Sequence, residues 1–117
     1  MSMAADPHLQ GADRVREVFI RVRNGDASVA DLYADDGVIV YGDGEGDRIE
    51  GRDAIRAFYQ GTIDAMHPQP TVEAVLEAPP MYVALVEVPT DGVHHRALDL
   101  FEVDEDGIRR LEIYTRK

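Results

Sequence analysis

The sequence RALDLFEVDEDG, residues 96–107, decides the fold of this chain. It predicts a strand that runs into a tight acidic turn, after which residues 108–115 form a closing strand. Side chains alternate between the two faces of a strand, so Asp99 lies on the same face as Ala97, Phe101 and Val103. A carboxyl group among such apolar neighbours is shielded from bulk water. We therefore expect it to be paired, protonated or used in function.

The carboxy-terminal half of the chain is expected to consist of strands. Runs of β-branched and apolar residues alternate with short turns that contain proline, or glycine next to aspartate. The expected strands are Thr71–Ala78, Tyr82–Val88, His94–Val103 and Ile108–Thr115. Short turns between consecutive strands predict an antiparallel meander.

The amino-terminal part predicts two helices before the first strand. We expect the first helix to begin near Asp6-Pro7 and to end at Asn24-Gly25. Its apolar stripe has helical spacing and consists of Val15, Val18, Phe19 and Val22. Asp26 is expected to cap a second, short helix. That helix would bury Val29, Leu32 and Tyr33.

The middle of the chain predicts a pair of short strands and a third helix. The strands are Val38–Tyr41 and Arg48–Glu50, joined by a glycine-rich turn at residues 42–46. The helix begins at Gly51 and ends at His67, because the prolines that follow cannot continue a helix. One side of it carries Ile55, Phe58, Tyr59, Thr62, Ile63 and Met66. Together these elements predict an α+β domain with three helices on one face of a curved antiparallel sheet.

Length and composition narrow the function classes. The 117 residues suit one domain over residues 1–117, in which we expect residues 1–8 to be a loose arm. The formal net charge is −11, so attraction to nucleic acid or to anionic membranes is disfavoured. There is no cysteine, which excludes disulfides and thiolate sites. No secretory signal or membrane-spanning run is evident, so we expect a cytoplasmic protein.

Two segments resemble the NTF2-like superfamily, and within it the SnoaL-like and ketosteroid-isomerase-like branch. They are LYADDGV at residues 32–38 and GRDAIRAFY at residues 51–59, followed by the closing pair of strands. The resemblance covers roughly residues 12–115, about the length of one domain. It implies a cone-shaped half-barrel closed by helices, with a pocket inside the cone, as in the cystatin-like roll. This superfamily hosts several reactions and also proteins without one, so the resemblance implies the fold more strongly than the activity.

Ketosteroid isomerases use a carboxylate base together with a tyrosine and a protonated aspartic acid as hydrogen-bond donors. By this resemblance, Asp99 occupies the position of the donor aspartic acid. Tyr33 and Tyr59 match two tyrosines that support the donor tyrosine, whose own position is taken by Val18. The base position is taken by Tyr41. Two of the three catalytic groups are therefore absent, which argues against faithful ketosteroid isomerisation.

Candidate catalytic residues are Asp99, Tyr59 and Asp43. Each has a structural alternative: Asp99 as an acid tied to a tyrosine or amide, Tyr59 as a buried tyrosine with a partner for its hydroxyl, and Asp43 as part of a solvated turn. The expected pocket residues are Val18, Tyr33, Tyr41, Phe58, His95, Phe101 and Leu111.

No metal or cofactor is expected. His94 and His95 are neighbours on a strand, so they point to opposite faces and cannot chelate one ion together. His95 shares a face with Asp99 and reaches either the rim of the pocket or solvent.

The predicted function is that of a small-molecule pocket protein. It would bind a hydrophobic, carbonyl-bearing ligand, with Asp99 as an oxyanion-type hydrogen-bond donor. If it is an enzyme, the expected chemistry is proton transfer beside the carbonyl, as in an isomerase or cyclase, with Asp43 or His95 as the candidate base. The alternative is a non-catalytic binding or dimerisation module whose pocket is filled by core side chains.

A homodimer is also expected. With Asp99 inside the cone, Leu98, Leu100 and Tyr114 lie together on the convex face of the sheet. A soluble monomer seldom leaves such an apolar patch exposed, and the family that the chain resembles commonly forms dimers.

Overall fold

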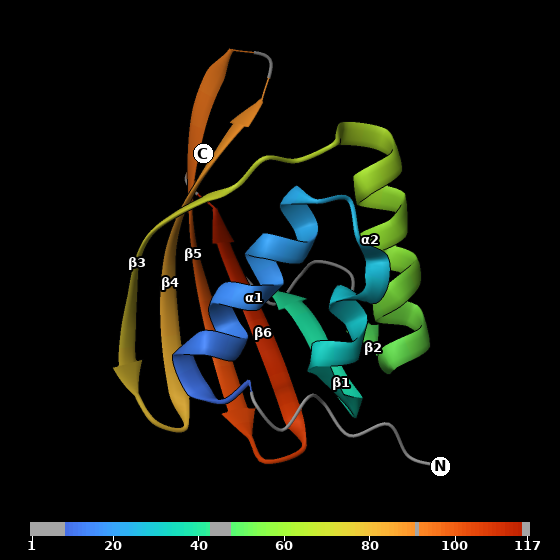
Figure 1. The fold of residues 1–117 in the computed structure, drawn as a ribbon, viewed down its shortest axis with the longest axis vertical. Coiled ribbons are helices and arrows are strands. Elements are labelled where there is room, and N and C mark those ends of the chain that lie inside the picture. Colours follow the sequence, from blue (N-terminus) through green and yellow to red (C-terminus); the bar gives the residue numbers. More distant parts are fainter. Residues whose placement is uncertain (1–8, 43–47, 91, 116–117) are drawn as a thin grey trace.

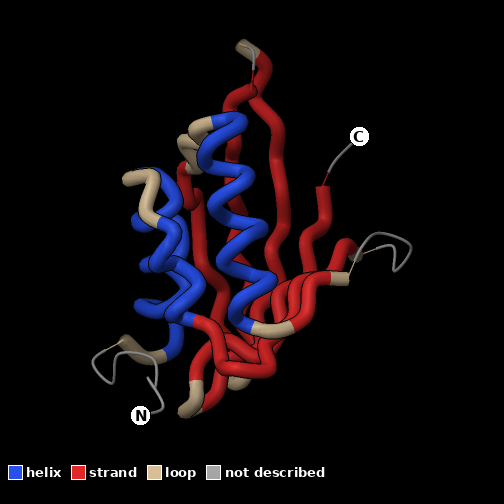
Figure 2. Tube along the Cα trace, turned by 90° about the vertical axis from the view of Figure 1, so that its right-hand side faces the viewer, coloured by secondary structure: helices blue, strands red, loops and turns tan. Residues whose placement is uncertain are grey.

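The computed structural model describes residues 9–42, 48–90 and 92–115 (Figure 1). The helical layer consists of α1 (Gly11–Arg23), the 3₁₀ helix η1 (Ala27–Leu32) and α2 (Arg52–Met66). These helices cover one face of a curved, unclosed sheet, as the side view shows (Figure 2). The α+β class expected from the sequence is therefore confirmed.

The sheet has six strands in the order β2-β1-β6-β5-β4-β3. In chain order they are β1 (Tyr33–Tyr41), β2 (Ile49–Glu50), β3 (Thr71–Ala78), β4 (Met81–Thr90), β5 (Val93–Asp104) and β6 (Gly107–Thr115). Strands β3 to β6 form the predicted antiparallel meander. The sheet is not antiparallel throughout, however, because β1 pairs in parallel with β6. Such a pair needs a long crossover, and α2 with the four strands β2 to β5 supplies it.

The first half of the chain departs from expectation in two places. Helix α1 begins at Gly11 with Gln10 as its cap, whereas Asp6-Pro7 lie outside the described residues. Tyr33 was expected in the second helix but begins strand β1. The predicted cap of that helix is confirmed, because the Asp26 carboxylate accepts a hydrogen bond from the Ser28 amide at 2.9 Å. The helix itself is of the 3₁₀ type.

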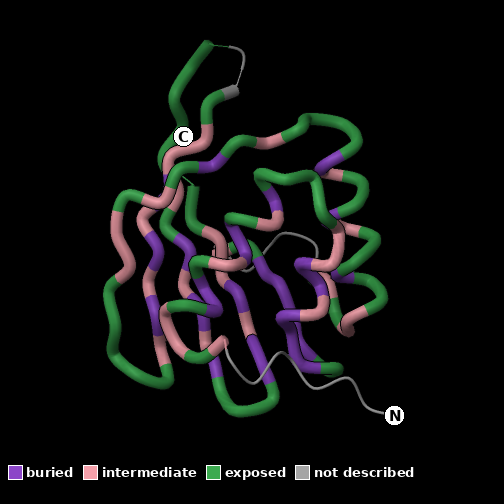
Figure 3. The backbone as a smooth tube through the Cα atoms, in the orientation of Figure 1, coloured by how far each residue is buried: buried purple, intermediate pink, exposed green. Residues whose placement is uncertain are grey.

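The register of the closing strands agrees with the alternation in residues 96–103. Asp99 is opposite Ile113, and Phe101 is opposite Leu111. Phe101 is fully buried and Asp99 is 8% exposed, so both face the helices. Buried stretches of the chain lie along the central strands of the sheet and in the helices that cover it (Figure 3). The other face of β5 is the convex one, on which Leu98 remains 38% exposed.

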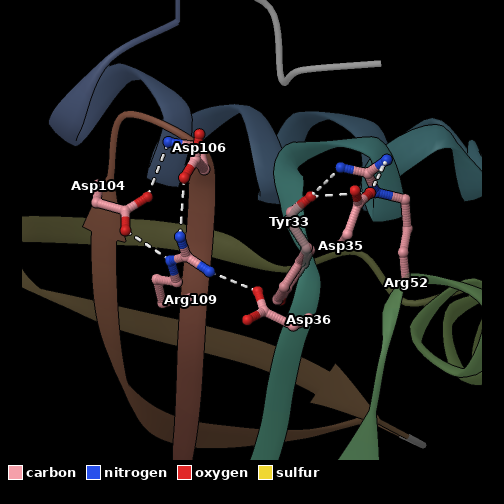
Figure 4. A network of polar contacts seen from close by, with 7 residues as sticks. All are labelled: Tyr33, Asp35, Asp36, Arg52, Asp104, Asp106 and Arg109. Atoms are coloured by element: carbon pink, nitrogen blue, oxygen red, sulfur yellow. Dashed lines mark hydrogen bonds and ion pairs between the residues drawn. The ribbon is translucent and has the colours of Figure 1, made fainter. Parts of the chain in front are cut away.

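Two arginines hold the start of β1 against its neighbours (Figure 4). Arg109 on β6 forms ion pairs with Asp104 at 2.6 Å and with Asp106 at 2.8 Å, and it also contacts Asp36 on β1. Arg52 at the start of α2 donates to the Tyr33 carbonyl at 2.7 Å and 3.1 Å. These contacts fix the β5–β6 turn, α2 and the first residue of β1 relative to one another.

The β5–β6 turn packs directly onto the backbone between η1 and β1. Gly107 has φ +125°, and a Cβ atom there would lie 2.9 Å from the Leu32 carbonyl oxygen and 3.0 Å from the Ala34 nitrogen. No backbone atom can easily move away at this junction. The position therefore requires glycine both for its conformation and for the close approach.

We predict that Gly107→Ala lowers the free energy of unfolding by roughly 2–5 kcal/mol, the sum of backbone strain and overpacking. The matched control is Gly61→Ala in α2, where a Cβ would meet nothing within 4 Å. It should raise stability by about 0.5–1 kcal/mol, because alanine is the better helix former. Urea unfolding measures both. Equal effects of the two substitutions would contradict the proposed packing of the turn.

Candidate functional site

A cavity of about 320 Å³ lies between the helices and the concave face of the sheet. Helix α1 contributes Val18, Phe19 and Val22 to its wall, and α2 contributes residues from Phe58 to Met66. The sheet contributes alternate residues of β4 and β6, Tyr41 of β1, and four residues of β5, namely His95, Arg96, Ala97 and Asp99. Among the predicted site residues, those in the wall are Val18, Tyr41, Phe58, Tyr59, His95, Asp99 and Leu111.

Among the described residues, Asp99 is the one carboxylic acid in this wall. Its Oδ1 atom is buried and has no hydrogen-bond partner among the described residues. Burial removes the carboxyl group from water, which disfavours its charged form and raises the pKa of Asp99 from 3.8 to about 7. The group is thus a carboxylic acid that can keep its proton near neutral pH and has an oxygen left without a partner.

Tyr59 lies close to this acid and is hydrogen-bonded to a second tyrosine. The hydroxyl oxygens of Tyr33 and Tyr59 are 2.6 Å apart in a buried pair. Burial raises the pKa of both phenols, so both keep their protons. Tyr59 lines the cavity, whereas Tyr33 lies behind it and is fully buried. The carbonyl contacts of Arg52 hold the backbone of Tyr33 and so help to place this pair.

Phe101 was expected in the pocket but belongs to the core next to it. Its ring makes an edge contact with Phe19, with ring centres 6.1 Å apart, and the residue is fully buried. Phe101 shares a strand face with Asp99, but Phe19 covers its ring on the helical side. It supports the cavity wall without lining it.

The outer part of the cavity contains Tyr41 and His95. Tyr41 ends β1 and is 37% exposed. His95 is exposed on the part of β5 that projects with β4 beyond the rest of the sheet (Figure 1). Asp43, the other candidate base, lies outside the described residues.

Several wall residues were missed by the sequence analysis. Val86, Val88 and Thr115 share strand faces with predicted residues, so consistent use of the alternation would have found them. Ala97 was expected on the face of Asp99 and lines the cavity with it. Thr62 and Met66 follow Phe58 at helical spacing. Pro68 and Pro70 carry no such signal, because they follow the helix in an irregular segment.

The described residues contain no group of three side chains that could hold a metal ion. The two histidines on β5 face in opposite directions: His94 contacts Glu87, while His95 lines the cavity. None of the helices among the described residues is long and apolar enough to cross a membrane. Among the described residues of the wall, the buried ones that carry a hydroxyl or carboxyl group are Asp99 and Tyr59.

The raised pKa of Asp99 predicts a pH-dependent stability. Between pH 3.8 and about 7, the folded protein keeps a proton that the unfolded chain has released. Stability should therefore fall as the pH rises through this window, by on the order of 4 kcal/mol in total. Asp99→Asn cannot titrate, so its stability relative to the wild type should increase from about pH 5 to about pH 8.

Urea unfolding of both proteins across this range measures the effect. The exposed turn variant Glu105→Gln is the control and should follow the wild type, because Glu105 is solvated. A difference between Asp99→Asn and the wild type that does not change with pH would show that Asp99 is not a buried acid with a raised pKa.

Comparisons with known proteins agree with this architecture. The family model of the SnoaL-like domain matches residues 15–111. A protein of known structure from Sphaerobacter thermophilus is 30% identical, with 99% of each chain covered and a TM-score of 0.74. The search of curated proteins found no match.

Two further structures share the fold at lower identity. A candidate ketosteroid isomerase from Kribbella flavida DSM 17836 is 20% identical, with 99% of this chain and 83% of that chain covered and a TM-score of 0.82. A candidate SnoaL-like polyketide cyclase from Jannaschia sp. CCS1 is 14% identical, with coverage of 89% and 83% and a TM-score of 0.73. Because the family model covers most of the chain, this protein belongs to the SnoaL-like domain family.

Proposed function

We propose that this protein binds a hydrophobic, carbonyl-bearing small molecule in the cavity, with protonated Asp99 as hydrogen-bond donor to the carbonyl oxygen. The observation that carries the proposal is the buried carboxyl group of Asp99, whose Oδ1 has no partner among the described residues. Leaving a buried polar atom without a hydrogen bond costs about 1–3 kcal/mol. A ligand oxygen in the cavity would supply the missing partner.

The surroundings of Asp99 suit a neutral carbonyl compound. The wall is predominantly apolar and includes Phe19, Phe58 and Leu111. Such a wall favours hydrophobic ligands, and a few polar groups orient them. A carbonyl oxygen accepts a hydrogen bond from a protonated acid, and that bond strengthens if negative charge develops on the oxygen during a reaction.

Tyr59 is the second donor in this proposal. Each hydroxyl in the Tyr33–Tyr59 pair has one proton, and only one of these protons can lie between the two oxygens. If Tyr33 donates to Tyr59, the proton of Tyr59 is available to the ligand. Because Tyr33 is fully buried behind Tyr59, this arrangement gives the cavity a second donor next to Asp99.

If the protein is an enzyme, we propose proton transfer beside the carbonyl, of the isomerase or cyclase kind. The candidate isomerase and cyclase among the similar structures support this reaction class at the level of the fold. The candidate base is Asp43. His95 is four residues from Asp99 on β5, roughly 13 Å away, which is too far to act on a carbon next to a carbonyl that Asp99 binds. Tyr41 stands at the position where the resembled isomerases have a base, and a phenol is a poor substitute for a carboxylate base.

The alternative function, a non-catalytic module with a filled cone, is less well supported. The cavity of about 320 Å³ lies within the range of ligand pockets. The Oδ1 atom of Asp99 in its wall has no partner in the part of the chain that the structure describes, which a purely structural role leaves unexplained.

The test of the proposal uses 2-acetylnaphthalene, with 2-ethylnaphthalene as the probe that lacks the carbonyl. The wild type should bind the ketone about two- to tenfold more tightly, the value of one net hydrogen bond. Asp99→Leu should remove that preference, and Asp99→Asn should retain it because its amide still donates. In the wild type the preference should decrease as the pH rises through about 7, where Asp99 loses its proton.

Probe fluorescence measures these affinities directly, and Glu105→Gln is the control because that residue is exposed and remote from the cavity wall. Equal affinity of the wild type for the two probes would refute the proposed role of Asp99.

We also propose that the convex face forms a homodimer contact. Leu98 is 38% exposed, Tyr114 is 41% exposed, and the two residues are opposite each other on β5 and β6. Leu100 adds a half-buried side chain on the same face. Sedimentation at micromolar concentration should give twice the monomer mass, and the double variant Leu98→Glu, Leu100→Lys should sediment as a monomer. A monomeric wild type would refute the contact.

A further inference from the structure

We propose that the ligand is an elongated molecule with an oxygen at each end, and that His95 binds the outer oxygen while Asp99 binds the inner one. The inference rests on the proposed function, because it extends the ligand that Asp99 holds. It makes His95 a residue that determines which carbonyl compounds the cavity prefers.

On the concave face of β5, one small side chain lies between two polar side chains. Asp99, Ala97 and His95 are alternate residues of this strand, and all three line the cavity. Asp99 and His95 are four residues apart, which on a strand corresponds to roughly 13 Å between their Cα atoms. Between them Ala97 presents only a methyl group. A flat ligand can therefore lie along the strand from Asp99 to His95.

The strands on either side make this path mainly apolar. Val86 on β4 is opposite Ala97, and Val88 is opposite His95. On the other side, Ile113 on β6 is opposite Asp99. All three side chains line the cavity. The body of the ligand thus contacts mainly hydrocarbon, although Thr115 on β6, opposite Ala97, also lines the cavity. Arg96 of β5 reaches the wall as well but is paired with Glu73, so Asp99 and His95 remain the polar groups at the two ends of the path.

His95 has no visible role in holding the fold together. Its neighbour His94 is engaged by Glu87 on β4, whereas His95 is exposed and has no hydrogen bond among the described residues. Arg96, the next residue, forms an ion pair with Glu73 at 3.6 Å. Of these three consecutive polar residues, His95 is the one whose side chain is both directed to the concave face and free to bind a ligand.

The spacing defines the class of ligand. A hydrogen bond at each end takes roughly 2.8 Å, which leaves on the order of 8 Å between the two ligand oxygens. A rigid bicyclic ring system with a ketone at one end and a hydroxyl at the other has this length. The cavity volume of about 320 Å³ accommodates such a molecule.

The experiment compares 6-acetyl-2-naphthol, which has both oxygens, with 2-acetylnaphthalene, which lacks the hydroxyl. In the wild type the hydroxyl should tighten binding about two- to tenfold, as one net hydrogen bond does. His95→Ala should bind the two compounds about equally tightly, while its affinity for 2-acetylnaphthalene should equal that of the wild type. His94→Ala is the matched control and should keep the full advantage, since His94 points away from the cavity.

The outcomes separate this inference from the proposed function. If the wild type prefers 2-acetylnaphthalene to 2-ethylnaphthalene but gains nothing from the hydroxyl, or if His95→Ala keeps the advantage, the role of His95 is refuted and that of Asp99 stands. If the wild type does not distinguish the ketone from the hydrocarbon, the proposed function is refuted, and the role of His95 that rests on it is refuted as well. Circular dichroism of each variant checks that the fold is retained.

Discussion

The burial of a single carboxyl group, that of Asp99, is the constraint on which the structure of the site depends. A charged carboxylate surrounded by apolar side chains would be strongly destabilising, so the group raises its pKa to about 7 and keeps its proton over much of the pH range. The protonated acid is at once a fold element that occupies a core-like position and a hydrogen-bond donor without a partner. The same burial therefore explains why the folded protein should lose stability as the pH rises towards about 7 and why Asp99 can donate a hydrogen bond to a ligand.

The rest of the fold maintains this environment. Helices α1 and α2 close the concave face, and the tyrosine pair places a second hydroxyl group beside the acid. That pair depends in turn on the start of β1, which Arg52 and Arg109 hold from opposite sides (Figure 4). These arginines bind carboxylates and a carbonyl outside the cavity. The charged network and the apolar cavity thus occupy different parts of the molecule.

The position of Asp99 could be predicted from the sequence because the side-chain period of a strand is two, so one residue fixes the face of its neighbours. The parallel pairing of β1 with β6 could not, since it joins segments far apart in the chain and neither contains a local signal for the other. Tyr33 was misassigned for a similar reason: contacts from α2 and the β5–β6 turn, and not local propensity, make it the first residue of a strand. The hydrogen bond between Tyr33 and Tyr59 also depends on this tertiary placement.

The most direct test of this account is the pKa of the Asp99 carboxyl group, measured by carbon-13 NMR titration of the wild type with Asp99→Asn used to assign the signal. The account predicts a midpoint near 7, raised from 3.8 by burial. It also predicts a further increase when 2-acetylnaphthalene is bound, because the ligand accepts a hydrogen bond from the protonated form alone. A midpoint at or below the ordinary value for aspartic acid would mean that the group is ionised in the folded protein, and would contradict the role of Asp99 as a donor.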